Sequence, residues 1–368
     1  YSSNQKINLT LVKDVNVDGK YSAIIKDVPE SFKYNASIDD ARTKDYEVTA
    51  LERPQISGLT ATQKYPEFTN QEPSEHVPGD FTFFPGSTVT LNISSTKDLE
   101  SGKIRFIEED LLDLDAVKAA MDGIDLVFHL AANPDIRLGT QITDTDLKQG
   151  TVATYNVLEA MRCAGVENIA FSSSSVVYGE ALEMPTPESY GPLFPISLYG
   201  ASKLGSEALI TSWVGTFGLK AWLFRFANIV GARGTHGVIF DFIHKLKADS
   251  SRLEVLGNGR QEKSYMEVID CAHAMVHLTE TTDAQVNCFN LGTHDTCSVR
   301  RIAEIVIEET GFQNVSIEYT GGDRGWAGDV PKTMLDPGAL FETGFKPNFN
   351  SEEAIRHTAS TLIQEIGL

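Results

Sequence analysis

Strand-like and helix-like segments alternate from about residue 103 to the end of the chain, and this rhythm constrains the fold more than any other feature. Short apolar runs are typical of buried strands, and helical spacing that ends at a glycine is typical of the segments between them. We expect strands at 104–107, 124–130, 168–172 and 220–226, and helices at 115–121, 151–164 and 197–215. This alternation predicts an α/β fold, a doubly wound parallel sheet with helices on both faces.

Residues 1–96 lack this alternation. They hold six of the 14 prolines, and turn formers separate strand-like segments at 7–12, 20–26, 45–51 and 87–93. The pattern is typical of short antiparallel strands, as in a β-sandwich. A chain of 368 residues is long enough for two domains. We therefore predict a β-rich segment of unknown function at 1–96 and an α/β domain at 97–368.

The composition limits the classes of partner that the chain can bind. A net charge of −20 argues against nucleic acid or an anionic membrane surface, although a local Lys/Arg pocket could still hold a small anion. No apolar run reaches the roughly 18 residues of a membrane span, and no basic-then-apolar leader opens the sequence. The four cysteines have no metal-ligand spacing. We expect free thiols, no metal site and a cytoplasmic location.

The strongest chemical signal is a tyrosine four residues before a lysine, Tyr199 and Lys203, near the start of a predicted helix. This spacing places both side chains on one helix face. An ammonium beside a phenol favours the phenolate and lowers its pKa, so the tyrosine can exchange a proton with a substrate hydroxyl. The serine run 172–175 ends the predicted strand 168–172, where open α/β sheets bind ligands.

Six motifs then follow in order: Asp110-Leu111, His129-Leu130-Ala131-Ala132, Ser172 to Gly179, Tyr199-xxx-Lys203, Arg225 to Gly231, and Gly328-Asp329-Val330-Pro331. Over residues 103–368 they resemble the extended short-chain dehydrogenases/reductases of the NAD-dependent epimerase/dehydratase family, in its UDP-glucose 4-epimerase-like branch. The resemblance implies a Rossmann-like fold, NAD as cofactor, a substrate lobe mainly from about residue 228 onward, and a homodimer paired through the helix at 199–215.

The resemblance also implies residue roles. Ser174, Tyr199 and Lys203 would be the catalytic trio. The cofactor would contact Asp110, Leu111, Leu130, Ala131, Ala132, Ser172, Tyr199, Lys203 and Ala227. The nucleotide-sugar substrate would contact Ser174, Asn228, Lys263, Arg324 and Asp329. Structural alternatives remain open: Asp110 as a helix-entry residue, the alanines as packing, Asn228 as a loop cap, and Lys263 and Arg324 as surface charges.

The implied reaction is 4-epimerisation of a UDP-sugar through a 4-keto intermediate. Family dehydratases usually carry an Asp-Glu pair where this chain has Ser174 and Ser175, which argues against dehydration. Another sugar-nucleotide oxidoreductase (a decarboxylase, dehydratase or keto-reductase) stays an alternative. So does a non-enzymatic envelope-type β protein fused to an inactive epimerase fragment.

One family feature is missing where it is expected. A glycine-rich loop after the first strand normally sets the cofactor pyrophosphate at a helix N-terminus, but no G-x-x-G-x-x-G lies before residue 103. We therefore expect the first βα unit to be absent, with the segment 88–93 as a candidate for the second strand. Each lost charge-assisted hydrogen bond costs about 1.5–3 kcal/mol, so we expect weak NAD binding and impaired activity.

Overall fold

A computed structural model describes residues 105–136, 138–325 and 330–368, together with parts of the N-terminal region: 12–13, 21–22, 32–34, 37–38, 41–42, 44, 46–48, 56–65, 71–76 and 88–95. The chain divides into two compact units, Tyr1–Ile104 and Arg105–Leu368. Within the described residues, no helix is long and apolar enough to cross a membrane.

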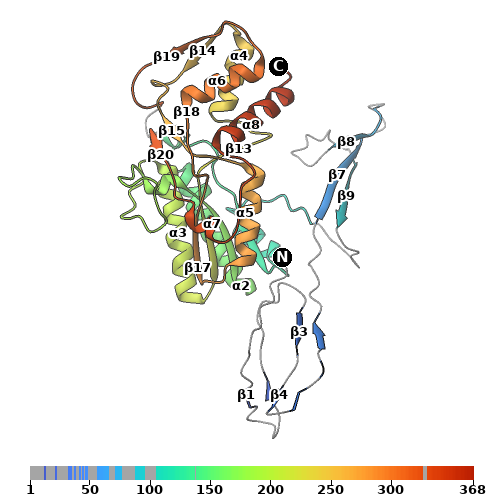
Figure 1. Cartoon of the computed structure of the whole chain (residues 1–368). Helices are drawn as coiled ribbons and strands as arrows, with labels where there is room; N and C mark the ends of the chain where they lie inside the picture. The colour runs from blue at the N-terminus through green and yellow to red at the C-terminus, as the bar shows by residue number, and fades with distance from the viewer. Residues whose placement is uncertain are drawn as a thin grey trace. The chain divides into compact units, whose positions relative to one another are not determined.

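The described strands of the first unit pair antiparallel (Figure 1). They are β1 (Val12–Lys13) with β2 (Tyr21–Ser22), β3 (Phe32–Tyr34) with β6 (Tyr46–Val48), β4 (Ser37–Ile38) with β5 (Ala41–Arg42), and β8 (Ser74–His76) and β9 (Thr88–Ser95) on either side of β7 (Ile56–Lys64). Most of the predicted segment 7–12 lies outside the described residues. The candidate second strand is corrected, because β9 pairs antiparallel with β7 and joins no parallel sheet. The sandwich arrangement stays a prediction.

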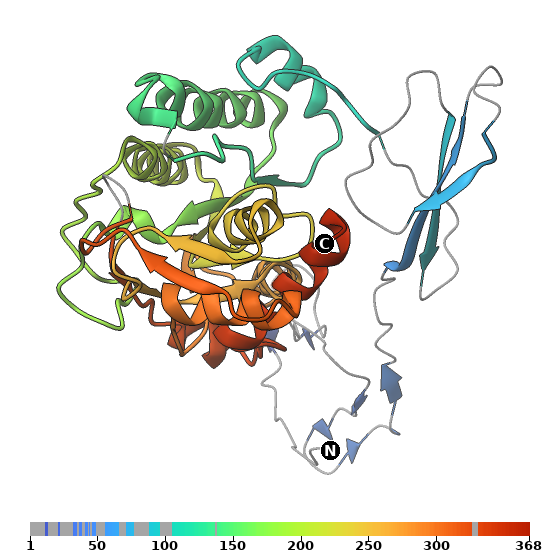
Figure 2. The same ribbon diagram turned by 90° about the horizontal axis from the view of Figure 1, so that it is seen from above.

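The second unit is built on a parallel sheet, as its alternating sequence predicts. Its four strands stand in the order β10 (Leu126–His129), β11 (Asn168–Ser174), β12 (Lys220–Phe226) and β17 (Val286–Leu291). One face is covered by α1 (Leu114–Ala120), α2 (Ala153–Ala164) and α3 (Leu198–Phe217), and the other by α5 (Val268–Thr281) and α7 (Gly338–Glu342) (Figure 2).

Side-chain alternation along the central strands explains these layers. Ile169 and Phe171 of β11 pack into the cluster beneath α1, α2 and α3, whereas Ala170 between them faces the cluster beneath α5. On β12, Leu223 and Trp222 divide in the same way. A parallel sheet buried on both faces needs nearly continuous apolar strands, which these are.

Most predicted elements of this unit are present. The strands at 124–130, 168–172 and 220–226 correspond to β10, β11 and β12, and the helices at 115–121 and 197–215 to α1 and α3. The helix predicted at 151–164 begins earlier, as the π-helix η3 (Leu147–Val152) leading into α2, which ends at Gly165 with φ 73°. The strand predicted at 104–107 is wrong over its described part, because residues 105–107 form no strand.

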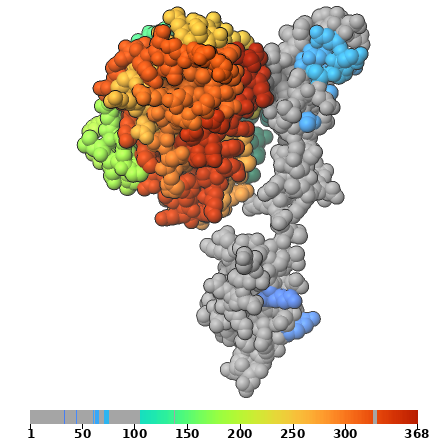
Figure 3. Space-filling model, turned by 45° about the horizontal axis from the view of Figure 1, so that its top comes forward, coloured from blue at the N-terminus to red at the C-terminus, as the bar shows by residue number. Residues whose placement is uncertain are grey.

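A second core lies in the C-terminal part. It packs α4 (Val238–Ala248), β14 (Arg252–Val255), β16 (Tyr265–Glu267), α6 (Val299–Thr310) and α8 (Ser351–Ile366) around one apolar cluster. The short strands β13 (Asn228–Val230), β15 (Glu262–Lys263), β18 (Cys297–Ser298), β19 (Ser316–Tyr319) and β20 (Lys332–Thr333) complete it. Figure 3 shows the orange and red C-terminal segments forming a broad continuous surface.

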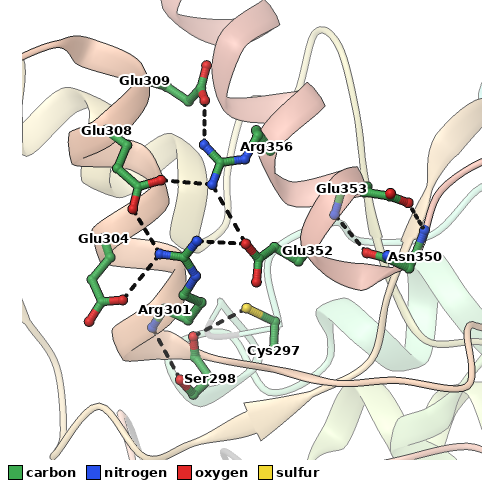
Figure 4. A network of polar contacts seen from close by, with 10 residues as sticks. All are labelled: Cys297, Ser298, Arg301, Glu304, Glu308, Glu309, Asn350, Glu352, Glu353 and Arg356. Atoms are coloured by element: carbon green, nitrogen blue, oxygen red, sulfur yellow. Dashed lines mark hydrogen bonds and ion pairs between the residues drawn. The ribbon is translucent and has the colours of Figure 1, made fainter.

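A network of ion pairs ties α6 to α8 on this part of the molecule (Figure 4). Arg301 contacts Glu308 at 2.9 Å on its own helix and Glu352 at 2.7 Å on α8. Arg356 reaches back from α8 to Glu308 at 2.8 Å. Because two arginines share carboxylates from both helices, the network fixes their relative placement better than isolated surface pairs would.

Candidate functional site

The end of β11 and the first turns of α3 bring the predicted reactive groups together. Lys203 on α3 is only 3% exposed, and its Nζ donates a hydrogen bond of 2.5 Å to the carbonyl oxygen of Ser172. The same ammonium lies 4.8 Å from the centre of the Phe171 ring and 5.7 Å from that of Tyr199. Lys203 therefore points toward the end of β11 and not into solvent.

Tyr199 is half-buried, one helical turn before Lys203. Burial, and then the carboxylate of Asp146, raise the pKa of Tyr199 to about 12. Burial lowers the pKa of Lys203 to about 8, against the carboxylate of Glu207, which raises it. The sequence predicts that the ammonium lowers the tyrosine pKa, but in this structure burial and Asp146 raise it. At neutral pH the site holds a neutral phenol beside a largely protonated amine.

Ser174 is the last residue of β11 and the N-cap of the short helix η4 (Ser175–Tyr178), where its Oγ accepts a 3.4 Å hydrogen bond from the Val176 amide. The helix α3 packs against η4 and β11. Gly200, next to Tyr199, makes this approach possible, because a Cβ there would lie 3.0 Å from the Val176 carbonyl oxygen. The serine that ends β11 and the first turn of α3 are thus neighbours.

A cavity of about 330 Å³ lies beside β10, at the edge strand of the described sheet. Four predicted cofactor residues line it, namely Asp110, Leu111, Leu130 and Ala131. Ala132 follows directly and is half-buried. Asp110 also has a structural role, because its Oδ1 accepts a 2.9 Å hydrogen bond from the Leu112 amide in the turn that leads to α1.

The other predicted contacts near the strand ends also have local partners. Ser172 is buried, and its Oγ donates to the His129 carbonyl at 3.3 Å. Ala227 follows β12, and its amide donates to the Leu291 carbonyl at 2.8 Å. The side-chain amide of Asn228, the first residue of β13, donates to the Ser264 carbonyl at 3.1 Å.

The three remaining residues predicted to contact the substrate lie in separate segments of the chain. Lys263 lies half-buried in β15, between β18 and β20. Arg324 is exposed and forms an ion pair with Glu180. Asp329 lies outside the described residues. None of these contacts assigns a substrate role.

Sequence reasoning missed two buried groups beside the tyrosine–lysine pair. His129 donates or accepts a 3.0 Å hydrogen bond with Thr154, and burial together with the Lys203 charge lowers its pKa to about 4. Asp146 is 1% exposed; its Oδ1 accepts from Asn133 at 3.0 Å, while its Oδ2 has no hydrogen-bond partner within the described part of the chain. No spacing in the sequence marks Asp146, because it belongs to a segment without helical or strand period.

A buried ion pair, Glu207 with Arg225, was also missed. Two signals could have found it. Glu207 repeats the four-residue spacing of Tyr199 and Lys203, and Arg225 is a charge within an otherwise apolar strand.

The chain contains two G-x-x-G-x-x-G spacings, one at Gly231, Gly234 and Gly237, between β13 and α4, and one at Gly322, Gly325 and Gly328. Both lie after residue 103. Gly237 has φ 98°, which favours glycine, and no side chain in the described part of the chain caps the N-terminus of α4. Gly231 is needed for packing, because a Cβ there would lie 2.3 Å from Val268 Cγ1.

The residues present fit part of a dinucleotide. The cavity beside β10 is lined mainly by apolar side chains together with the carboxylates of Glu109 and Asp110, which suits an adenosine group. The buried Lys203 beside Tyr199 suits hydroxyl groups and a second ring at the strand ends. A phosphate-binding loop next to the cavity is not encoded before residue 103.

A family model described as the NAD dependent epimerase/dehydratase family matches residues 40–292. The match covers the parallel sheet through β17 and starts within the predicted segment 1–96. A UDP-glucose 4-epimerase of Corynebacterium glutamicum is 30% identical over 240 residues, which are 61% of this chain and 73% of that protein.

The solved structures that are similar to this chain include UDP-sugar 4-epimerases. A UDP-galactose 4-epimerase is 39% identical, with a TM-score of 0.63, over 70% of this chain and 83% of its own. A UDP-glucose 4-epimerase of Thermus thermophilus, in complex with NAD, is 27% identical, with a TM-score of 0.61, over 69% of this chain and 83% of its own.

Proposed function

The chain belongs to the NAD dependent epimerase/dehydratase family, and from this premise we propose that it interconverts UDP-sugars by inverting C4 through a 4-keto intermediate. Similarity to a UDP-galactose 4-epimerase and to two UDP-glucose 4-epimerases supports this choice of substrate. The observation that carries the proposal is the buried Lys203 ammonium, bound to the Ser172 carbonyl one helical turn from Tyr199.

Each member of the trio has a distinct task. Tyr199, as the phenolate, takes the proton from the sugar 4-hydroxyl and later returns it. Because its pKa is about 12, it needs the Lys203 charge to stabilise the phenolate at the moment of transfer. Ser174 donates a hydrogen bond to the same hydroxyl. NAD, when bound, supplies the acceptor and donor of the C4 hydride.

We place the sugar-nucleotide diphosphate near Asn228 and the loop 231–237. Among the described residues no side chain caps the N-terminus of α4, and helix N-termini can bind anions through their free amide groups. Lys263, Arg324 and Asp329 belong to this proposed substrate region. The side-chain hydrogen bond from Asn228 to Ser264 would have to break, or the backbone of residue 228 would have to make the contact instead.

The assay is conversion of UDP-galactose to UDP-glucose with added NAD⁺. Tyr199→Phe and Lys203→Met should each lower kcat by about 10²-fold or more, because proton transfer by a positioned group contributes that much. Tyr155→Phe is the matched control, because it removes a hydroxyl on the surface of α2 and keeps the apolar ring there. An unchanged rate for Tyr199→Phe, or products that include water or CO₂, would contradict the proposal.

Cofactor affinity is a separate part of the proposal. The chain lacks the expected loop before residue 103, so it should bind NAD⁺ weakly. Isothermal titration should give a Kd well above micromolar. An affinity of about 1 μM or tighter would show that other groups hold the pyrophosphate, and it would remove this part of the proposal without touching the reaction.

We further propose a homodimer that pairs through α3. Phe217 at the end of this helix is 50% exposed and Tyr155 on the adjacent α2 is 42% exposed, which leaves apolar surface for a second copy to cover. Light scattering should give twice the mass of one chain, and Phe217→Glu should shift the protein toward the monomer.

A further inference from the structure

Glu207 and Arg225 form a bidentate ion pair close to the Tyr199–Lys203 pair. The Arg225 Nη2 to Glu207 Oε2 distance is 2.7 Å, and the Arg225 Nε to Glu207 Oε1 distance is 3.0 Å. The side chain of Arg225 is 8% exposed and that of Glu207 is 6% exposed. Glu207 lies on α3, one turn after Lys203, and Arg225 lies on β12, so the pair joins the helix to the sheet.

Further hydrogen bonds hold the carboxylate in place. Ser173 Oγ donates to Glu207 Oε1 at 2.5 Å. The neighbouring carbonyl, that of Ser172, accepts the hydrogen bond from Lys203. Two successive residues of β11 are thus bound by two successive turns of α3. Arg225 is satisfied on its far side by the Tyr178 hydroxyl, at 3.0 Å.

We propose that Glu207 is a positioning residue for the Tyr199–Lys203 pair: held by Arg225 and Ser173, its carboxylate keeps the buried Lys203 amine charged and aimed at β11. Tyr199, Lys203 and Glu207 follow one another at four-residue spacing and so share one face of α3. The inference rests on the proposed function only for its catalytic consequence. Its structural content concerns the charge on Lys203.

The charges around Lys203 come from four elements. On α3 itself they are Tyr199, which is neutral at pH 7, and Glu207. From β10, His129 is also neutral, because its pKa is about 4. The carboxylate of Asp146, just before η3, acts on Tyr199, and Arg225 on β12 is neutralised by Glu207.

Removing the Glu207 charge should lower the pKa of Lys203 in two ways. It takes away the anion that raises the pKa of Lys203, and it leaves the Arg225 cation without its partner, so repulsion also disfavours a second cation nearby.

The test is a pH titration of Lys203 in the full chain labelled with ¹³C at lysine Cε, followed by NMR, with Lys203→Arg to identify the signal. The midpoint starts near pH 8 and should fall by about one pH unit in Glu207→Gln. Glu159→Gln is the matched control, because Glu159 forms an exposed 2.7 Å ion pair with Arg162 on α2. An unchanged or higher midpoint in Glu207→Gln would overturn the proposal.

A second variant covers the case in which Glu207→Gln does not fold. In Glu207→Gln combined with Arg225→Gln no charge is left unpaired. The Lys203 midpoint should lie below that of the native chain but above that of Glu207→Gln alone, because the loss of the Glu207 anion, one turn away on the same helix face, outweighs the loss of the Arg225 cation on β12. An unchanged midpoint in the double variant would also overturn the proposal. The readout needs neither NAD nor a sugar nucleotide, so a failed epimerase assay and a failed titration are distinguishable.

Discussion

Burial controls protonation at the reactive end of α3. It raises the pKa of Tyr199 to about 12 and lowers that of Lys203 to about 8, so the two pKa values, which are nearly equal in the free side chains, move apart. A substrate hydroxyl proton can move to Tyr199 only when Tyr199 is a phenolate, and the Lys203 ammonium stabilises that anion. The phenolate–ammonium pair carries one proton fewer than the phenol–ammonium pair that prevails at pH 7, so the activity should rise as pH rises toward about 8, where the pair loses that proton.

The burial of the Glu207–Arg225 pair leads to a prediction about the free energy of unfolding. Arg225→Met leaves the Glu207 carboxylate unpaired in the interior and should lower the free energy of unfolding by about 3–5 kcal/mol. Urea denaturation measures this. Arg162→Met, which breaks the exposed pair with Glu159, should leave the free energy within experimental error. Equal effects of both variants would contradict the assigned burial.

For individual residues, the sequence predicts which residue types form the site better than it predicts where their side chains point. The Tyr199–Lys203 spacing and the serine run fix the neighbourhood, because helix and strand periods are regular. The direction of Asn228 was not predictable, since it depends on the carbonyl of Ser264, 36 residues away. The role of Asp146 depends in the same way on tertiary contacts that no local period encodes.

Among the helices and strands, the strands that helices cover on both faces were predicted well. The strands β11 and β12 are apolar over their length because helices cover both faces. The predicted strand at 104–107 failed because an apolar run becomes a strand only beside another strand. Phe106 in that run is 86% exposed.

The network between α6 and α8 gives a pH-dependent prediction. Hydrogen bonds from Arg356 and Arg301 lower the pKa of Glu308 below 4.5, and those from Arg301 do the same for Glu352. A carboxyl group whose pKa is lowered by folding stabilises the fold above pH 4.5, and this stabilisation is lost as pH falls below that value. Arg301→Gln should therefore lower Tm at pH 7 and reduce the loss of Tm on acidification.

The control for this prediction is Lys118→Gln, which removes a single exposed pair with Asp115 at 3.8 Å. Its Tm should follow that of the native chain at every pH. If Arg301→Gln loses as much Tm between about pH 5 and pH 3 as the native chain does, the network is not the source of the acid sensitivity.

On the scale of the whole molecule, the chain joins two units of different character. The first has antiparallel pairs in its described residues, and the second has a parallel sheet. The family match begins at residue 40 and so crosses the division at residue 104. Composition and prolines located a boundary near residue 96, but the family relationship of the N-terminal part could not be read from them.

Limited proteolysis tests the division into domains. We expect a stable fragment that starts near residue 97, because the second unit has its own cores and all four strands of the described parallel sheet. N-terminal sequencing of the resistant fragment gives the boundary. A single resistant core that retains residues 40–96 would mean that this segment completes the second unit.

The most direct test of the central claim follows the hydrogen at C4. UDP-galactose carrying deuterium at C4 is incubated with the protein and about 5 mM NAD⁺, a concentration chosen because binding should be weak. If the hydride leaves C4 and returns to the opposite face of the same carbon, UDP-glucose should form with the label retained, and Tyr199→Phe should prevent it. Loss of the label to water, or no conversion by the native chain at this NAD⁺ concentration, would contradict the account.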